Sequence, residues 1–284
     1  MTYRVRAVAA GQLLGVMLMA GTPAPSLAQE PAYLADRGDG IRTSLLATYV
    51  GPREFVFYPF YEYTRTRKFE YKPSDFGAVG NVDFKGNTYQ REWLVFLGYA
   101  LSDSLLLEFE SALRSTVDFR KSPDDGSALP AQIRESGVGD TEAQLRWRYA
   151  KETETRPDIT FFFETVFPLQ RSKKLLGTQH WQFATGAVLT KGYSFGTLSL
   201  RGGVGYDRGD RKFTVGEYAI DYLKKLSPQW RVALTLEGHE SEQAIIGEVQ
   251  YSLSKDIILK LNSGFGLSSR DRAFAPEIGV LFRF

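Results

Sequence analysis

The feature that most constrains this chain is a two-residue alternation of apolar and polar side chains, which starts at Phe55 and recurs to the last residue, Phe284. Successive side chains of an extended strand point to opposite faces, so this pattern predicts strands with one apolar and one polar face. The clearest examples are residues 105–119, 139–149, 230–238 and 257–267. The sequence therefore predicts an all-β fold.

The alternation divides the chain into about twelve segments, most of them close to the length that a tilted strand needs to cross a membrane. The predicted strands are 54–65, 89–100, 105–119, 139–149, 159–167, 179–190, 196–207, 213–226, 230–238, 244–253, 257–267 and 276–284. The links between them alternate in length: 101–104 is short, whereas 66–88 and 121–136 are long and polar. Two links on the long side, 208–211 and 240–243, are short. Short turns at one end and longer loops at the other are typical of transmembrane barrels, whose short turns face the periplasm.

The last strand ends on an aromatic residue at the C-terminus. One face carries Ile278, Val280, Phe282 and Phe284, and the other carries Glu277, Gly279 and Arg283, with Leu281 as the exception. This ending resembles the sorting signal of bacterial outer-membrane β-barrels, in which the barrel-assembly machinery reads the strand that closes the barrel. These nine residues alone fit an ordinary soluble strand equally well. With the remaining pattern, they are predicted to be the assembly signal.

The beginning of the chain has the features of a secretory signal peptide. Arg4 and Arg6 precede an apolar core at 8–19, and the small residues at 26–28 form a cleavage site before Gln29. Residues 1–28 are therefore predicted to be removed. We expect residues 29–53 to be a leader in the lumen or the periplasm, and residues 54–284 to form a single antiparallel up-and-down β-barrel.

Composition narrows the class of protein further. The chain has no cysteine, which excludes thiolate metal sites and cysteine nucleophiles, and its net charge of +2 argues against nucleic acid as a partner.

Aromatic residues adjoin the short turns, as in the girdle where a barrel meets lipid headgroups. They are Tyr99, Tyr149, Tyr193, Tyr222, Trp230 and Tyr251. Two soluble β-sandwiches would also alternate, but they would not explain all these features together. The predicted location is the bacterial outer membrane, in contact with its lipid.

If the apolar face meets lipid, the polar face must line the lumen. The candidate lumen-lining residues are Tyr58, Phe60, Leu94, Phe96, Glu108, Glu110, Arg114, Asp140, Glu142, Arg146, Arg148, Phe162, Glu164, Arg201, Glu217, Arg231, Glu237, Glu248 and Lys260. Two interpretations of the charges stay open: they pair across strands and fill the lumen, or their acidic excess favours cations and neutral solutes. The apolar candidates form a strip along the lumen. Either an aromatic molecule moves along this strip, or the strip packs against residues 45–50.

An enzymatic role has little support in the sequence. A barrel-rim hydrolase needs a histidine beside a serine or an acid. The chain has two histidines, and His239 lies near Ser241 in a link where polar residues are expected anyway. No zinc-binding helix or phosphate-binding loop is present. We expect a protein that is not an enzyme and needs no cofactor.

The middle third of the chain resembles the MetA-pathway phenol-degradation family. The landmarks are Gly137-Val138-Gly139-Asp140, Arg146-Trp147-Arg148-Tyr149, Phe167-Pro168, Leu176-Gly177-Thr178, Lys191-Gly192-Tyr193 and Gly203-Val204-Gly205-Tyr206. One departure is Pro168-Leu169-Gln170, where the family has a proline-threonine-glycine turn. The resemblance implies an outer-membrane barrel with transport as its inferred role, and it supplies no catalytic residues.

Together these observations predict a channel or transporter for small molecules, aromatic or hydrophobic ones included. The alternatives are a structural or surface-interaction barrel with a plugged lumen and, with less support, a barrel-rim hydrolase that uses His239.

Overall fold

The computed structural model describes residues 31–209, 211–239, 242–267 and 272–284. The predicted signal peptide lies outside these residues, as do Glu240 and Ser241 of the proposed hydrolase motif. In the described part of the chain, no helix is both long and apolar enough to cross a membrane.

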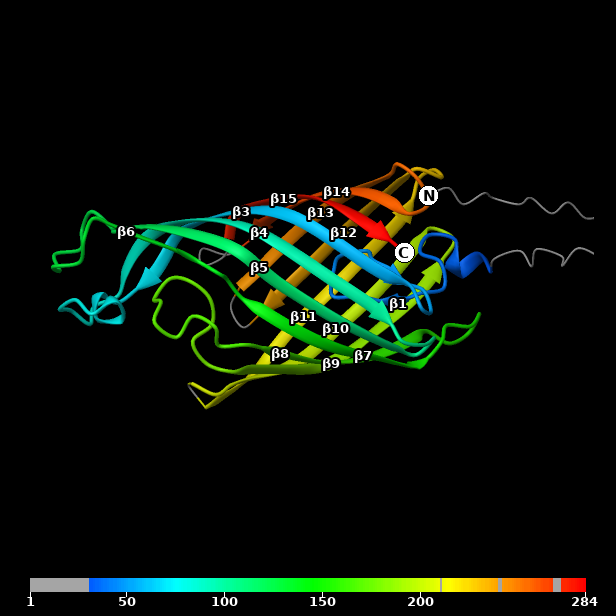
Figure 1. The fold of residues 1–284 in the computed structure, drawn as a ribbon, viewed down its shortest axis with the longest axis horizontal. Helices are drawn as coiled ribbons and strands as arrows, with labels where there is room; N and C mark the ends of the chain where they lie inside the picture. Colours follow the sequence, from blue (N-terminus) through cyan, green and yellow to red (C-terminus); the bar gives the residue numbers. More distant parts are fainter. Residues whose placement is uncertain (1–30, 210, 240–241, 268–271) are drawn as a thin grey trace, which may run out of the picture.

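The described chain forms one large antiparallel sheet that closes on itself (Figure 1). Of its thirteen strands, β6 pairs only with β5, and the other twelve follow one another around the barrel. These twelve are β3 (Phe55–Tyr71), β4 (Phe84–Ala100), β5 (Leu105–Arg120), β7 (Thr141–Ala150), β8 (Asp158–Val166), β9 (Gln182–Tyr193), β10 (Gly196–Asp207), β11 (Lys212–Lys225), β12 (Trp230–His239), β13 (Glu242–Ser252), β14 (Ile257–Gly266) and β15 (Arg272–Arg283). The predicted twelve-stranded up-and-down barrel is confirmed.

The first and last strands close the barrel, as the terminal pattern predicts. β15 pairs with β3 from Arg272↔Thr66 to Arg283↔Val56. At the end of this ladder, the backbone N–H of Phe284 donates to the carbonyl of Phe55 at 2.9 Å, and the carbonyl of Phe284 accepts from the N–H of Phe55 at 3.1 Å.

The outer face of the barrel carries many large apolar side chains. Trp93, Leu107, Leu145, Phe163, Leu234 and Leu261 are between 40% and 61% exposed. Tyr99, Tyr149, Tyr193 and Trp230 are exposed beside the short turns, where a headgroup girdle is expected. A continuous apolar outer face is stable in lipid, and a closed barrel leaves no backbone edge unpaired there.

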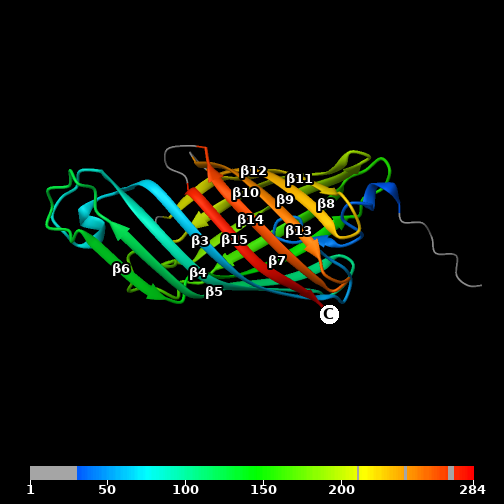
Figure 2. The same ribbon diagram turned by 90° about the horizontal axis from the view of Figure 1, so that it is seen from above.

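Strands β3, β4 and β5 extend well beyond the other strands at the long-loop end (Figures 1 and 2). The prediction that 66–88 is a polar loop is wrong at both its ends, because β3 and β4 stay paired as far as Tyr71↔Phe84. β6 (Gln132–Gly137) adds a fourth strand beside β5. An aromatic cluster stabilises this extension: the ring of Tyr71 lies 4.7 Å from that of Phe119.

A β-bulge in β5 reverses which residues face inward. Leu94 of β4 pairs with Ala112, but its neighbour Trp93 pairs with Arg114, so Leu113 is the extra residue. Trp93 is 61% exposed on the outer face. Because directly paired residues share a face, Arg114 also points outward, and its predicted place in the lumen is wrong.

The same bulge moves the apolar residues that follow it. Val117 and Phe119, which the uninterrupted alternation places on the lipid side with Leu107, are instead buried inside at 3% and 0% exposed. Phe119 then joins the aromatic cluster of the extension.

Candidate functional site in the barrel lumen

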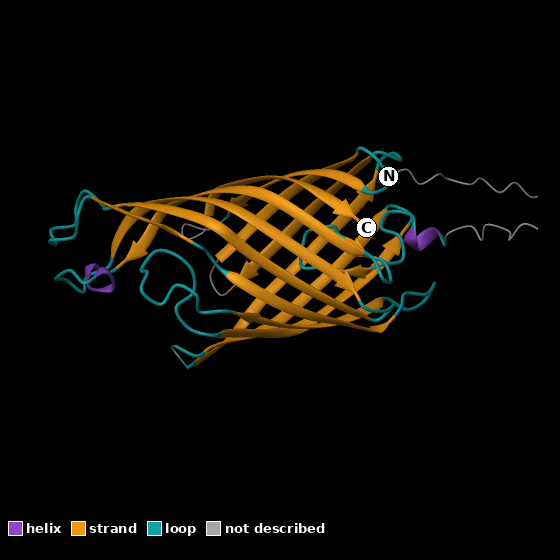
Figure 3. Cartoon of the chain, viewed as in Figure 1, coloured by secondary structure: helices purple, strands orange, loops and turns teal. Residues whose placement is uncertain are grey.

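The barrel lumen is occupied by the residues that precede β3, the first strand of the barrel. Residues 31–53, called the plug from here on, contain the short helix η1 (Ala32–Leu34) and a small hairpin of β1 (Ile41–Arg42) and β2 (Tyr49–Val50). Figure 3 shows η1 at the end of the barrel where the C-terminus lies, and helix η2 (Pro73–Phe76) at the opposite end. The plug therefore lies at the short-turn end.

Apolar contacts join the plug to the strip predicted on the first strands. Ile41 and Val50 of the plug pack in one cluster with Tyr58, Phe60 and Phe96. Tyr58 and Phe96 have no exposed surface. Of the two interpretations left open for this strip, packing against the leader is the one found, although the contacts extend to Ile41.

Buried ion pairs hold the base of the plug. Arg37 pairs with Glu152 at 2.7 Å, and each side chain is only 1% exposed. Arg42 pairs with Asp221 of β11 at 2.8 Å. A charge removed from water is stable only with a partner in good geometry, so each arginine fixes its part of the plug to one place on the wall.

The turn between β1 and β2 is held by a separate set of polar groups. The backbone N–H and hydroxyl of Ser44 both donate to Glu108, which also pairs with Arg146 at 3.1 Å. The Lys260 ammonium donates to the carbonyl of Leu46 at 2.9 Å and to the hydroxyl of Thr48 at 3.0 Å. Glu108, Arg146 and Lys260 are thus engaged in closing the lumen.

Where the plug reaches the short turns, a further network is centred on Asp39, which lies outside the strands of the barrel. Asp39 pairs with Arg148 at 3.0 Å and with Lys151 at 3.1 Å, and Lys151 also reaches Asp103. Burial alone would raise the pKa of Asp39, but hydrogen bonds from Lys151 and the charge of Arg148 outweigh it, so the pKa lies below its usual value. Asp39 therefore stays ionised at neutral pH.

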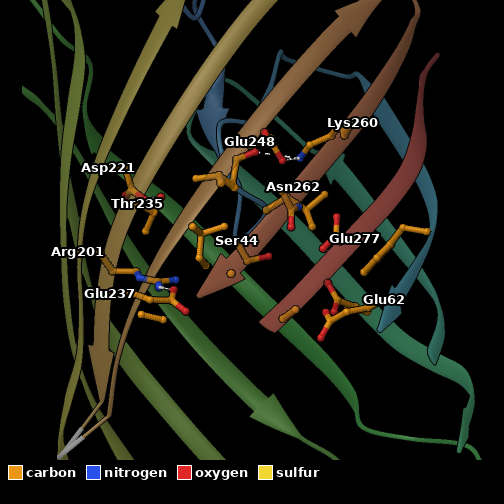
Figure 4. Close-up of a pocket in the computed structure, with 18 of the residues that line it drawn as sticks. Ser44, Glu62, Arg201, Asp221, Thr235, Glu237, Glu248, Lys260, Asn262 and Glu277 are labelled. Atoms are coloured by element: carbon orange, nitrogen blue, oxygen red, sulfur yellow. Dashed lines mark hydrogen bonds and ion pairs between the residues drawn. The ribbon is translucent and has the colours of Figure 1, made fainter. Parts of the chain in front are cut away.

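A cavity of about 210 Å³ lies above the plug and opens toward the long loops (Figure 4). We call it the loop-side cavity. Its charged lining consists of Glu62, Glu110, Asp221, Glu237, Glu248, Glu277, Arg42, Arg201 and Lys260. Ser44, Leu45 and Leu46 of the plug form part of its wall, and Phe60 and Ile246 add apolar surface. The cavity is thus apolar on some sides and acidic on others.

The three basic groups of this lining each pair with an acid. Arg42 pairs with Asp221, Arg201 with Glu237 at 3.4 Å, and Lys260 with Glu248 at 3.2 Å. Glu62, Glu110 and Glu277 have no basic partner within 4.0 Å among the described residues; Glu277 instead accepts a hydrogen bond from Tyr58 at 2.6 Å. The lining therefore contains more acidic than basic side chains.

Two further cavities adjoin the lumen. One of about 340 Å³ lies against β8 to β11, where Phe162 and Glu164 face Gly203 and Gly205. The other, of about 700 Å³, lies at the short-turn end below the plug, and we call it the turn-side cavity. Arg231, Ile258 and Arg37 line it.

The structure brings together only some of the candidate lumen residues. Phe60, Glu110, Arg201, Glu237, Glu248 and Lys260 line the loop-side cavity, whereas Tyr58, Leu94, Phe96, Glu108, Arg146 and Arg148 contact the plug, its apolar cluster or its polar network. Glu142 lies opposite Glu110 in the ladder of β5 and β7, and Glu164 accepts a hydrogen bond from Gln144. The side chain of Glu217 lies outside the described residues. Asp140 is exposed and accepts a hydrogen bond from Thr178 at 2.6 Å.

The candidates drawn from the sequence did not include three residues that anchor the plug in the lumen. Arg37 and Arg42 lie in a leader without clear alternation, and Glu152 lies in a turn. Arg42 meets Asp221 across 179 residues of sequence. The available signal was the pair of arginines beside the apolar residues Ile41 and Val50, which is unusual for a solvated linker.

Two of the sequence landmarks that are far apart in the chain meet in space. Leu176, 1% exposed, lies against Gly137, and a side chain at Gly139 would collide with Ala112 at 2.6 Å. The hydrogen bond from Thr178 to Asp140 closes the same contact. Glycine is required at 139 because Ala112 of β5 leaves no room for a Cβ atom, whereas at 137 a Cβ atom would come within 3.2 Å of the end of the Leu176 side chain.

Comparisons with known proteins bear on the fold. No protein-family model matches the sequence, and no curated protein matches it. The crystal structure of an outer-membrane channel from Pseudomonas putida is similar, with a TM-score of 0.57 and 15% identity over 86% of this chain and 99% of that one. The translocator domain of the autotransporter NalP from Neisseria meningitidis gives a TM-score of 0.50 and 10% identity, over 82% of this chain and 89% of that one. With its closed sheet and apolar outer face, the chain is a bacterial outer-membrane β-barrel.

Proposed function

We propose that this barrel is a channel for small molecules, neutral or positively charged, that enter the loop-side cavity and pass the plug. The observation that carries the proposal is the cavity itself, which has an acidic excess and ends on a turn of the plug. Fixed negative charge in a narrow site raises the local concentration of cations.

The size of the barrel limits which solutes can pass. Roughly twelve strands enclose a lumen narrower than that of a sixteen-stranded porin, and the plug fills part of it. Large solutes are therefore excluded, and conduction by the intact protein is small.

The chemistry of the cavity favours amphipathic solutes. Phe60, Leu45 and Ile246 offer apolar surface within the same space as Glu110 and Glu277. A small aromatic molecule with a polar or cationic group fits such a lining. The resemblance to the phenol-degradation family supports an aromatic substrate class, and the fold shared with an outer-membrane channel is consistent with transport.

Ion selectivity in planar bilayers tests this proposal. Glu62→Gln should lower the cation-to-anion permeability ratio, because Glu62 faces the cavity without a basic partner within 4.0 Å among the described residues. The charge-matched control is Asp83→Asn, an exposed aspartate of an outer loop.

Uptake of a small aromatic tracer into proteoliposomes tests the substrate class. Phe60→Ala should change its rate, since Phe60 lines the cavity, whereas a large sugar should stay excluded. If neither current nor tracer uptake exceeds that of a protein-free membrane, the channel proposal fails.

A plugged barrel with a structural or surface-interaction role is the second candidate. It is favoured by the buried contacts of the plug and by the outer extension, where Val79 and Val82 are 84% and 69% exposed. Such a barrel would show no transport in either assay. We propose no enzymatic activity for the lumen.

A further inference from the structure

The plug separates the loop-side cavity from the turn-side cavity by a thin layer. On β14, Lys260 lines the first cavity and Ile258 lines the second. These two residues are neighbours on the same face of one strand, about 7 Å apart along it. On β12, Thr235 lines the first cavity and Arg231 the second.

This layer consists of one turn of the plug and the wall side chains that contact it, among them Gln250, Glu248 and Lys260. The turn is residues 44–48, which we call the plug tip. Gln250 donates to the carbonyl of Ala47 at 3.3 Å and to Glu248 at 2.7 Å. Lys260 completes the layer through its bonds to Leu46 and Thr48 and its ion pair with Glu248. Other strands also hold the tip, because Ser44 donates to Glu108 of β5 and Ala47 packs with Leu223 and Ala233 of β11 and β12.

The tip is held less firmly than the base of the plug. The base has two buried ion pairs, and Ile41 and Val50 pack in the apolar cluster. In the tip, Ser44, Leu45 and Leu46 are half-buried and Ala47 and Thr48 are 2% exposed, but residues 44–48 carry no charged side chain that could form an ion pair with the wall. Ala47 has a φ of 50°, a left-handed conformation that is unfavourable for a residue with a Cβ atom. The wall contacts hold the tip in a shape that its own sequence disfavours.

We infer that the plug tip is the gate of the channel and that solutes cross along β12 to β14 when the tip leaves Lys260 and Gln250. The base of the plug stays in place during this movement. The inference rests on the proposed channel function, and it adds the path, the gate and the residues that keep it closed. The gate opens by a local change of one turn, without ejection of the whole plug.

Conductance of three variants tests this inference in planar bilayers. The first replaces residues 44–47 with two glycines, which removes the tip and keeps the base. The second, Lys260→Met with Glu248→Gln, removes the wall contacts without leaving a buried charge unpaired. The third lacks residues 31–52 and is the fully open reference. A shift in gel mobility on heating shows that each variant is folded.

The expected result is a conductance at least ten-fold above that of the intact protein for the shortened tip, and a rise of several-fold for the Lys260 and Glu248 variant. Asp83→Asn, which changes an exposed outer loop and neither the plug nor a cavity wall, is the control and should stay near the intact protein. If the shortened tip conducts no better than the intact protein while removal of residues 31–52 opens the barrel, the gate inference is wrong and the channel proposal stands. If removal of residues 31–52 also leaves the barrel closed, both are wrong.

Discussion

At the residue scale, buried ion pairs determine how firmly the plug is attached. Arg37 and Glu152 are each 1% exposed, and Lys191 also contacts Glu152 at 3.2 Å. Removing one partner of such a pair leaves an uncompensated buried charge, whereas removing both does not.

The change Arg37→Ala should therefore lower the stability of the plug by about 1.5–3 kcal/mol, the typical contribution of a hydrogen bond between charged groups, since Glu152 loses its closest partner and keeps Lys191. Hydrogen exchange of the amides in residues 37–50 measures this loss. The double change Arg37→Met with Glu152→Leu should restore part of the protection. Equal exchange in Arg37→Ala and the intact protein would contradict the role given to this pair.

Outward and inward residues of the same strand should differ in their tolerance of charge. Leu234, 48% exposed near the middle of β12, faces lipid, so Leu234→Arg should cost about 2–4 kcal/mol of unfolding free energy near the bilayer midplane. Asn262→Arg is the control, because Asn262 faces the acidic loop-side cavity. Unfolding by urea in lipid vesicles compares the two, and equal losses would mean that inside and outside are assigned wrongly.

At the scale of elements, period-two alternation was sufficient to locate the strands. The predicted 196–207 matches Gly196–Asp207, and 105–119 differs from Leu105–Arg120 by one residue. Alternation could not show the bulge at Leu113. One extra residue exchanges the inward and outward faces of the strand that follows it without changing the composition of that strand. The outer parts of β3 and β4 were missed because Tyr71 packs on Phe119, a partner distant in sequence.

The candidate site was predicted less well than the strands. Alternation gave the inward face of Glu108, Glu248 and Lys260, but not their partners in the plug. Those contacts join residues more than sixty positions apart, such as Ser44 and Glu108. No local pattern reports such a contact.

The last strand should govern assembly as well as closure. Removing Phe284, or making Phe282→Ser with Phe284→Ser, should reduce the amount of protein in the outer membrane, because the predicted assembly signal ends on these rings. Phe284 also lies 6.0 Å from the ring of Phe55. Fractionation with an antibody measures the level, and Phe274→Ser, an exposed position on the same strand, is the control. Normal levels of both terminal variants would contradict the assignment.

At the scale of the whole molecule, a closed hydrogen-bonded ring should resist detergent. Each of the twelve ring strands pairs with two neighbours, so the sheet has no free edge around the barrel. Unheated protein in dodecyl sulfate should migrate apart from boiled protein, and its circular dichroism should be dominated by strand. A water-soluble monomer without detergent would contradict the membrane barrel.

The position of the plug also bears on the order in which the molecule is completed. Residues 31–53 enter the lumen from the end where Phe284 lies, and the hairpin of β1 and β2 folds back toward β3 at that same end. No segment has to be threaded through the closed ring, so the plug can dock after β15 has paired with β3. A synthetic peptide of residues 31–53 should then bind in trans to a barrel that lacks them and lower its conductance, whereas a peptide of the same composition in scrambled order should not.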